Sequence, residues 1–227
     1  ESLLLYLLIN NDSFHRDRYF ELIEKHNLPV DKKRFESTIR NLNLLFITEL
    51  SGGKKIPVGK LKNYDIVNFD NEVIKRGATL NSALSNDQFA IYLKDSTNYS
   101  ITKFQQSFDI NNYVNGFQRY QKYSRENIHR ILNWDKNPNA LNVGGYQISP
   151  DKLSCPIFVT YDKKDDISET IKYEDRFITP KLFTYMSKSK RELNSPDVLA
   201  IRNQSNNNMR LPLFMKKSDD EKEVEFY

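Results

Sequence analysis

The chain has 227 residues, enough for one large domain or two small ones, and its mean hydropathy of −0.68 is low for a single compact enzyme. Its 14 Phe and 13 Tyr still supply enough apolar surface for a packed core, which argues against a disordered chain. The net charge is only +4, so a polyanionic partner has to be recognised by a local basic surface and not by the overall charge.

The cysteine content and the lengths of the apolar runs indicate the compartment in which the protein is expected. Cys155 is the only cysteine, so no internal disulfide can form, which fits a reducing compartment. No apolar run reaches the length of a bilayer and no signal-peptide pattern opens the chain, so we expect a cytoplasmic protein without a membrane partner. The sequence begins without Met inside a helical pattern and ends in an expected strand, so we also expect a piece of a longer protein.

The beginning of the chain predicts three short helices. Leucines at helical spacing over 3–8 mark the first, Ser13 is the expected N-cap of the second, and Asp31 is the expected N-cap of the third. Two β-like runs follow at 44–48 and 64–69. Three helices and a hairpin are the order of a winged-helix domain that docks on DNA, and a small helical connector with a hairpin fits the same pattern.

A glycine- and lysine-rich segment at 51–60 invites comparison with a phosphate-binding loop. That motif needs four residues between its first Gly and the Gly-Lys pair, and a Ser or Thr after the Lys. Here five residues separate Gly53 from Gly59, and Leu61 follows Lys60. We therefore expect a basic hairpin loop, either a solvated turn or a contact for a backbone phosphate.

The composition changes near residue 116. A mostly helical pattern at 77–95 gives way to a stretch at 98–122 that is rich in Asn, Gln, Tyr and Phe and predicts short strands and turns. We place a domain boundary there. Residues 1–115 are predicted to form a mainly helical domain, and residues 116–227 a second domain.

The second half predicts few helices and many strands. One helix begins after the N-cap Ser124 and stops at Asn133-Trp134, and another is expected at 196–203. Short strands are expected at 146–149, 156–161, 173–178, 210–216 and 223–227. This order favours a curved, partly closed β-sheet or barrel over a parallel doubly wound sheet, so the predicted fold class is α+β.

The stretch from Cys155 to Pro180 carries the strongest chemical signal. It begins as an apolar strand that ends at Tyr161 and then crosses a charged loop. Two aromatic rings that bracket two carboxylates and an arginine follow, in the order Tyr173, Glu174, Asp175, Arg176 and Phe177. A basic, hydroxyl-rich run comes next at 185–191, and such side chains donate to phosphate oxygens. Together they suit a pocket that reads a base beside a nucleic-acid strand.

Metal and nucleophile chemistry find little support in the sequence. The histidines at 15, 26 and 129 lack ligand spacing and are each expected on a helix surface. Cys155 precedes Pro156 at the start of an apolar strand, so we expect a buried, inert thiol. We expect no metal and no cofactor in this chain.

One short pattern keeps a nuclease alternative open. Pro150-Asp151 and the later Asp162-Lys163-Lys164 fit metal-dependent nucleases in which two carboxylates hold Mg²⁺ and a lysine stabilises the transition state. The pattern is common by chance, and the segment after Asp162 also fits a solvated turn. Asp151, Asp162 and Lys164 are therefore the least favoured site.

Three separated blocks of the second half resemble one domain family. They are YSRENIHRILNW at 123–134, CPIFVTYDKKDDISETIKYEDRFITP at 155–180 and FTYMSKSKREL at 183–193. The resemblance is to the C-terminal region of bacterial proteins that also carry a phospholipase-D-like nuclease and a superfamily-2 helicase, the SauUSI-like type IV (modification-dependent) restriction enzymes. It covers about 117–227, and residues 1–115 correspond by position to a coupler that follows the motor.

The resemblance implies a function and a fold. It implies recognition of 5-methylcytosine or 5-hydroxymethylcytosine in double-stranded DNA by base flipping, on an SRA-like, PUA-related β-barrel. The implied partners are the helicase and nuclease domains of the same polypeptide. This chain carries no phosphate-loop or phospholipase-D-type motif, so we expect the recognition part of an ATP-dependent restriction endonuclease and not an enzyme in itself.

Residue chemistry assigns roles within that function. Tyr161 and Tyr173 are predicted to stack on the flipped base, with Trp134 as the alternative ring. Glu174 or Asp175 is predicted to accept from the cytosine N4 amino group. The flanking phosphates are assigned to Ser187, Lys188, Ser189, Lys190 and Arg191.

Three alternatives to these roles stay open. Each aromatic ring fits ordinary core packing equally well. The acids before Arg176 fit a structural ion pair. The whole region also fits a protein-interaction or structural appendage of a helicase that has no base pocket.

Overall fold

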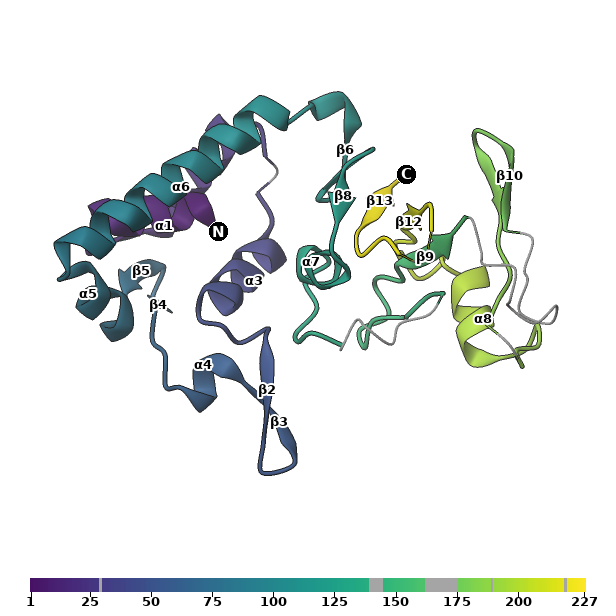
Figure 1. The fold of residues 1–227 in the computed structure, drawn as a ribbon, viewed down its shortest axis with the longest axis horizontal. Coiled ribbons are helices and arrows are strands. Elements are labelled where there is room, and N and C mark those ends of the chain that lie inside the picture. Colours follow the sequence, from purple (N-terminus) through teal and green to yellow (C-terminus); the bar gives the residue numbers. More distant parts are fainter. Residues whose placement is uncertain (29, 139–144, 162–174, 189, 219) are drawn as a thin grey trace. The chain divides into compact units, whose positions relative to one another are not determined.

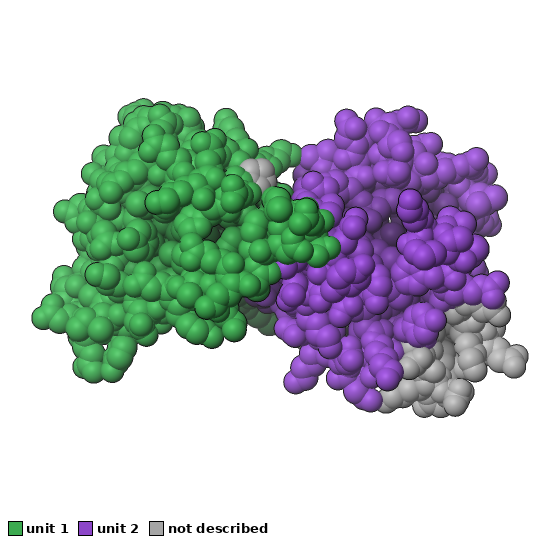
Figure 2. Space-filling model, turned by 90° about the horizontal axis from the view of Figure 1, so that it is seen from above, with its two compact units in different colours: residues 1–113, 133–137 green, residues 114–132, 138–227 purple. Residues whose placement is uncertain are grey.

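The computed structural model describes residues 1–28, 30–138, 145–161, 175–188, 190–218 and 220–227. The chain folds into two compact units, which Figure 2 draws in green and purple. Unit 1 comprises residues 1–113 and 133–137, and unit 2 comprises residues 114–132 and 138–227. Helices dominate unit 1 and strands dominate unit 2, which confirms the mixed α+β class.

Unit 1 opens with three helices and a short strand, α1 (Ser2–Asn10), β1 (Ser13–His15), α2 (Arg16–Lys25) and α3 (Lys32–Leu42). The predicted cap of the third helix is confirmed, because Asp31 accepts hydrogen bonds from two backbone N–H groups of the first turn. The predicted cap of the second helix is wrong. Ser13 instead pairs with strand β5 (Val73–Arg76), and the imidazole of His15 accepts from the Asp17 N–H.

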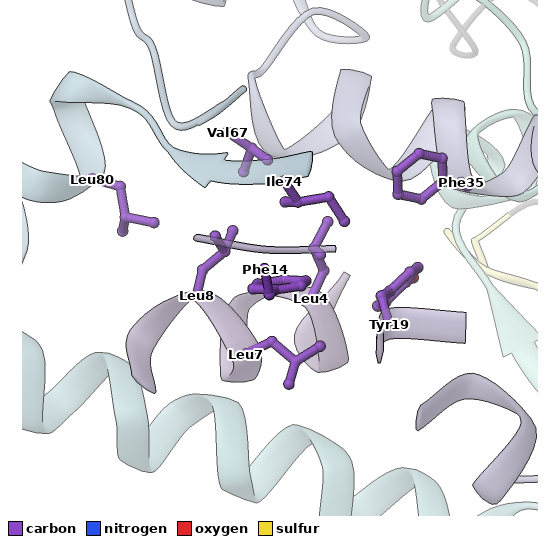
Figure 3. Packing of buried hydrophobic residues seen from close by; sticks show 9 residues of the cluster. All are labelled: Leu4, Leu7, Leu8, Phe14, Tyr19, Phe35, Val67, Ile74 and Leu80. Carbon is purple, nitrogen blue, oxygen red and sulfur yellow. The ribbon is translucent and has the colours of Figure 1, made fainter. Parts of the chain in front are cut away.

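A three-stranded antiparallel sheet in the order β1-β5-β4 packs on these helices, and β4 spans Val67–Asp70. The β4–β5 hairpin turns at Asn71 and Glu72, which both have positive φ. The buried cluster of unit 1, shown in Figure 3, consists of Leu4, Leu7, Leu8, Phe14, Tyr19, Phe35, Val67, Ile74 and Leu80. Unit 1 therefore has an apolar core made from its own helices and strands.

A second hairpin separates α3 from β4. Its elements are β2 (Thr48–Ser51), β3 (Lys54–Pro57) and the one-turn helix α4 (Val58–Leu61). The β-like runs predicted at 44–48 and 64–69 therefore do not pair with each other. Gly52 and Gly53 both adopt positive φ, which turns β2 back onto the next four residues, so β2 finds its partner locally.

Two further helices complete unit 1, α5 (Ala78–Leu84) and α6 (Asp87–Ser107), and the 3-10 turn η1 (Ile110–Asn112) follows. α6 runs alongside α1 (Figure 1). The strands and turns predicted from residue 98 are wrong as far as residue 107. Thr97, Ser100 and Ser107 donate to carbonyls four residues back, so these polar side chains are accommodated within the helix. None of the described helices is both long and apolar enough to cross a lipid bilayer.

The central sheet of unit 2 has the strand order β8-β13-β12-β9. Its strands are β8 (Lys122–Tyr123), β9 (Ile157–Thr160), β12 (Leu213–Lys216) and β13 (Val224–Phe226). β13 is antiparallel to both of its neighbours, whereas β12 and β9 are parallel. Helix α7 (Arg125–Ile131) lies between β8 and β9 in the chain, and α8 (Pro196–Arg202) precedes β12.

One face of this sheet carries a row of phenylalanines. Phe158, Phe214 and Phe226 are register partners on neighbouring strands, with ring centroids 5.7 Å apart for the first pair and 5.4 Å for the second. Phe117 packs on the row, 5.1 Å from Phe214. All four rings are buried, so this is the core side of the sheet. The next residue along each strand points to the opposite face.

The prediction of a curved, partly closed sheet or barrel is met only in part, because no closed barrel is found among the described residues. Besides the four-stranded sheet, this half of the chain has two separate two-stranded ribbons. They are β6–β7 (Tyr113–Val114 with Phe117–Gln118) and β10–β11 (Arg176–Thr179 with Leu182–Thr184). A barrel requires its first and last strands to pair, whereas β8 and β9 are opposite edges of this sheet. The strand predicted at 146–149 is reduced to an isolated bridge between Tyr146 and Ile157.

Candidate nucleic-acid interface

A pocket of about 600 Å³ lies on the face of the unit 2 sheet opposite the phenylalanine row. On this face Met215 of β12 is the register partner of Glu225 of β13, which in turn faces Lys122 of β8. The lining residues are Lys122, Tyr161, Phe177, Met215, Lys216, Lys217, Glu221, Glu225 and Tyr227. Small-molecule pockets have volumes of this order, and a single nucleobase fits within one.

Three aromatic rings of the pocket are exposed to solvent. Tyr161 follows β9 directly and is 60% exposed, and its N–H donates to the Lys216 carbonyl at 2.9 Å, which extends the pairing of β9. Tyr227 is 45% exposed, and its ring centroid lies 5.8 Å from that of Phe177. Exposed rings gathered in one pocket offer stacking faces to a planar ligand.

Charged side chains surround the same pocket. Lys122 Nζ lies 3.8 Å from Glu221 Oε2, and the Lys217 N–H donates to that oxygen at 3.4 Å. Burial, followed by the nearby charge of Glu225, raises the pKa of the Tyr227 hydroxyl. This phenol therefore stays protonated at neutral pH. The pocket accordingly presents both hydrogen-bond donors and carboxylate acceptors.

These groups match the faces and edges of a nucleobase. Aromatic rings stack on any base, and carboxylate oxygens accept from an exocyclic amino group such as N4 of cytosine. The thioether of Met215 provides a polarisable apolar contact of the kind that a methyl group needs. The lysines can neutralise a phosphate that remains attached to a base in the pocket.

Of the predicted base-pocket residues that the structure describes, only Tyr161 lines this pocket. Tyr173 and Glu174 lie outside the described residues. Trp134 is buried, and its segment, 133–137, belongs to unit 1. The aromatic partners of Tyr161 in the pocket are therefore rings that were not assigned from the sequence.

Asp175 has a structural contact. One of its carboxylate oxygens accepts from the Met186 N–H at 3.0 Å. This bond joins the residue before β10 to the segment after β11, so it closes the base of the β10–β11 ribbon. The same ribbon carries Phe177, whose ring lines the pocket.

The predicted phosphate-binding run is folded onto a tyrosine of unit 2. Lys188 Nζ lies 4.7 Å from the centre of the Tyr146 ring, a cation–π contact. Arg191 Nε donates to Asp197 Oδ2 at 2.8 Å, and the Tyr146 hydroxyl donates to the same oxygen at 2.7 Å. Two of the predicted cations therefore have partners inside unit 2.

The other members of the run are placed differently. Lys190 is exposed and adopts a positive φ of 61°, and Ser187 is half-buried. Ser189 lies outside the described residues. The assignment of these side chains to DNA phosphates stays a prediction.

The thiol of Cys155 and the imidazole of His129 are both fully buried in unit 2. Cys155 is buried as predicted, and burial raises the pKa of its thiol to about 12. His129 corrects the expectation of a helix-surface histidine, because it is 0% exposed. It follows the buried Ile128 in α7, and its Nδ1 donates to the Arg125 carbonyl at 2.6 Å. The short helix therefore buries adjacent residues and not only a single stripe.

Of the three residues in the nuclease pattern, only Asp151 lies within the described residues. Asp151 Oδ1 accepts from the Ser149 hydroxyl at 2.5 Å and from the Leu153 N–H at 3.0 Å, so it closes a turn. Asp162 and Lys164 lie outside the described residues. Within the described ranges, no three His, Cys, Asp or Glu side chains are grouped in a way that could hold a metal ion.

Most pocket residues were not assigned from the sequence, namely Lys122, Phe177, Met215, Lys216, Lys217, Glu221, Glu225 and Tyr227. The strand at 223–227 was predicted, and its Glu-Val-Glu-Phe-Tyr alternation is the signal that would have placed Glu225 and Tyr227 on one face. Lys122 has no such signal, because its position depends on the pairing of β8 with a strand about 100 residues further along the chain.

Family models match both halves of the chain. Residues 1–107 match a family described as Domain of unknown function (DUF8090), and residues 117–227 match a family described as Domain of unknown function (DUF3427). No curated protein matches the chain. The two matches leave only residues 108–116 between them.

Proposed function

We propose that the second of these domains of unknown function reads 5-methylcytosine or 5-hydroxymethylcytosine in double-stranded DNA, as part of an ATP-dependent type IV restriction endonuclease. The observation that carries the proposal is the pocket beside β12 and β13, where exposed aromatic rings and carboxylates face the same space. A base inside a duplex is covered on both faces, so it has to leave the stack before it can enter such a pocket.

The free-energy cost of flipping a base and the free energy gained by stacking it on aromatic rings are of comparable size. Extruding a base costs a few kcal/mol, and stacking on aromatic side chains returns about 1–3 kcal/mol per base. Tyr161 and Tyr227 each present an exposed ring for that purpose. Stacking alone therefore offsets only part of the cost of flipping. A base is bound in the pocket only if it makes further contacts there, and those contacts are the basis of selection.

Selection for cytosine rests on the carboxylates. We assign the reading of the N4 amino group to Glu225, which lines the pocket, because Glu221 already accepts from the Lys217 N–H and Asp175 from the Met186 N–H. Thymine offers only an acceptor at the same position and leaves the carboxylate unpaired. Met215 provides the contact for the 5-methyl group.

For unit 1 we propose a winged-helix-like coupler to the helicase of the same polypeptide. The order α1, β1, α2, α3, β4, β5, with the β2–β3 hairpin and α4 inserted between α3 and β4 and with β1 beside β5, supports this fold. In such a domain α3 is the helix that faces DNA. Here Arg40 of α3 donates to Asp135 at 2.7 Å and to the Asn133 carbonyl, so we assign the base reading to unit 2. An SRA-like, PUA-related fold for unit 2 belongs to the same proposal.

Binding of the whole chain to paired duplexes tests the modification-reading function. The duplexes differ only in the 5-methyl group of one cytosine, and the wild-type chain is expected to bind the methylated duplex about tenfold more tightly, the equivalent of 1.4 kcal/mol. Tyr161→Ala and Glu225→Gln are each expected to lower this ratio. A fluorescent base analogue beside the target cytosine should brighten on binding, because its stacking partner leaves. Equal affinity of the wild type for both duplexes sinks the proposal.

Tyr99→Ala is the matched control for Tyr161→Ala. Tyr99 lies on α6 and is 65% exposed, close to the 60% of Tyr161. The Tyr99 variant is therefore expected to keep the wild-type ratio. If both variants lose the same discrimination, the pocket is not the reader.

A protein-interaction appendage is the second candidate function. Ile91, Tyr92 and Tyr99 are all more than 60% exposed on α6, which favours a partner protein on that helix. This candidate predicts that the chain is not retained on DNA at low salt and that Tyr161→Ala changes nothing in the DNA assay.

A further inference from the structure

The β2–β3 hairpin of unit 1 is packed against the rest of the unit at its base, whereas its tip has no neighbouring atoms around the two glycines. At the base, the Gly59 N–H donates to the Leu44 carbonyl at 3.0 Å. A methyl group on Gly59 would lie 1.9 Å from the Asn43 carbonyl oxygen, so the two backbones are in direct contact there. At the tip, a methyl group on Gly52 or Gly53 would meet no atom within 4 Å.

The side chain of Asn43 fastens this base to the sheet of unit 1. Its Oδ1 accepts from the Ile66 and Val67 N–H groups at 2.9 Å, and its Nδ2 donates to the Val67 carbonyl at 2.7 Å. Asn43 directly follows α3, so one amide ties the end of that helix to the start of β4. The hairpin therefore extends from a fixed support (Figure 1).

Positive charge is concentrated on this hairpin and on α4. The segment 47–62 holds four lysines and one glutamate, a net charge of +3, in a chain whose total is +4. Glu49 lies 3.7 Å from Lys62. Lys54, Lys55 and Lys60 are exposed, and the first two directly follow the tip at the start of β3.

The hairpin also exposes one apolar side chain. Leu50 is 75% exposed and is the register partner of Lys55. Side chains of register partners lie on the same face of a β-ribbon, so an apolar group and an ammonium group are presented together. A single exposed leucine is common on protein surfaces, so the relevant feature is its place beside Lys55 on a basic hairpin.

We propose that this hairpin is a second DNA-contact element, which binds duplex DNA without reading its bases. Lys54, Lys55 and Lys60 contact phosphates, which supply the sequence-independent part of affinity. The tip of two glycines carries no side chains and is narrow enough for the minor groove, where apolar wedges such as Leu50 are a recurrent feature of DNA-binding proteins. The proposal shares its partner with the proposed function but rests on a different unit and on different residues.

The test titrates the whole chain with one unmodified duplex at several salt concentrations. Replacing Lys54 and Lys55 together by Gln is expected to weaken binding about tenfold at 200 mM salt relative to the wild type. The slope of log K against log salt should become shallower by about 2, because each phosphate contact contributes about 0.9. The affinity ratio between methylated and unmethylated duplexes should not change. Leu50→Asn is expected to weaken binding with the slope unchanged.

A charge-matched pair provides the control. Lys94 and Lys103 are exposed on α6 of the same unit, so replacing both by Gln removes the same charge elsewhere. This pair is expected to change affinity by less than about twofold. Equal losses in both pairs would mean that overall charge governs binding, which overturns the proposal. No loss in the hairpin pair also overturns it and points to an acidic protein as the partner of this surface. A lost methylation ratio with an intact hairpin effect overturns the base pocket alone.

Discussion

His129 is a residue whose burial has a measurable consequence. Its ring lies 6.0 Å from Phe158, and its Nδ1 donates to the Arg125 carbonyl. Burial lowers the pKa of the imidazole from 6.5 to about 4, because the charged form loses its hydration inside unit 2. The folded chain therefore keeps this histidine neutral at neutral pH, whereas the unfolded chain protonates it below about pH 6.5.

The first prediction is a loss of stability between pH 6.5 and pH 4. In this window the unfolded chain binds a proton at His129 that the folded chain does not bind, so the free energy of unfolding falls as the pH falls, by about 3 kcal/mol over the window. Urea unfolding at a series of pH values measures this slope. His129→Leu should remove the contribution, whereas His26→Gln, at the end of α2, should leave it in place. An unchanged slope in the His129 variant would contradict the burial argument.

Asp197 has the opposite kind of environment, in which the charged form is favoured. Burial raises the pKa of its carboxyl, but the hydrogen bonds from Tyr146 and Arg191 outweigh burial and bring the pKa from 3.8 to about 2. The stabilisation is therefore present above pH 3.8 and is lost as the pH falls toward 2. The same carboxylate positions Arg191 of the basic run.

The second prediction concerns the removal of this carboxylate charge. Asp197→Asn is expected to lower the free energy of unfolding at pH 7 by about 1–3 kcal/mol, because two hydrogen bonds lose their charged acceptor. Urea unfolding measures the change. Glu192→Gln, an exposed neighbour in the chain, should have an effect below about 0.5 kcal/mol. Equal effects of the two substitutions would show that the Tyr146–Asp197–Arg191 contacts carry no net stability.

At the level of elements, the sheet of unit 2 has one face buried in the core and an opposite face that lines the pocket. Phe214 has the phenylalanines of both neighbouring strands and Phe117 around it and is 0% exposed. Its neighbour Met215 lines the pocket on the other face. Substitutions at consecutive positions of one strand are therefore expected to have different consequences.

The third prediction compares two phenylalanines of unit 2. Phe214→Ala is expected to lower the free energy of unfolding by about 3–5 kcal/mol, because it leaves a cavity in the buried row. Phe177 is 37% exposed and lines the pocket, so Phe177→Ala should cost much less stability but weaken the binding of methylated DNA. Thermal or urea unfolding and the duplex assay measure the two effects. Equal destabilisation by both variants would contradict the division of the sheet into two faces.

Strands were predicted more successfully than their partners. The apolar runs at 156–161, 210–216 and 223–227 contain β9, β12 and β13, because alternating and β-branched residues are a local signal. The parallel pairing of β9 with β12 joins residues more than 50 positions apart and has no local signal. Without that pairing, Tyr161 could be predicted as a pocket residue, but Met215 and Glu225 could not be placed beside it.

At the scale of the whole molecule, the least predictable feature is the segment 133–137. The sequence predicts that this segment ends a helix of the second domain and that Trp134 is the alternative ring for stacking in the base pocket. In the structure the segment belongs to unit 1, where Asp135 binds Arg40 and the Asn137 N–H donates to the Phe46 carbonyl at 2.9 Å. These contacts join positions about 90 residues apart, so a periodicity or capping pattern cannot reveal them.

The whole chain also distributes its charge unevenly, and this leads to the last prediction. Several arginines of the described chain are engaged in ion pairs, such as Arg16 with Glu72 and Arg76 with Asp12, whereas the lysines of the hairpin tip are exposed and add to the positive surface available to a polyanion. Raising the salt concentration from about 50 to 200 mM is expected to weaken the binding of unmodified duplex at least tenfold, because counterion release scales with the number of phosphate contacts.

The ratio of methylated to unmethylated affinity is expected to stay within about twofold over the same salt range. Stacking, the N4 hydrogen bond and the methyl contact involve no counterion release, so they are insensitive to salt. Parallel titrations of both duplexes at each salt concentration measure the ratio. A ratio that collapses together with the affinity would mean that methylation is sensed through the phosphate backbone. The exposed rings of the pocket would then have no part in discrimination, and Tyr161→Ala would leave the ratio at its wild-type value.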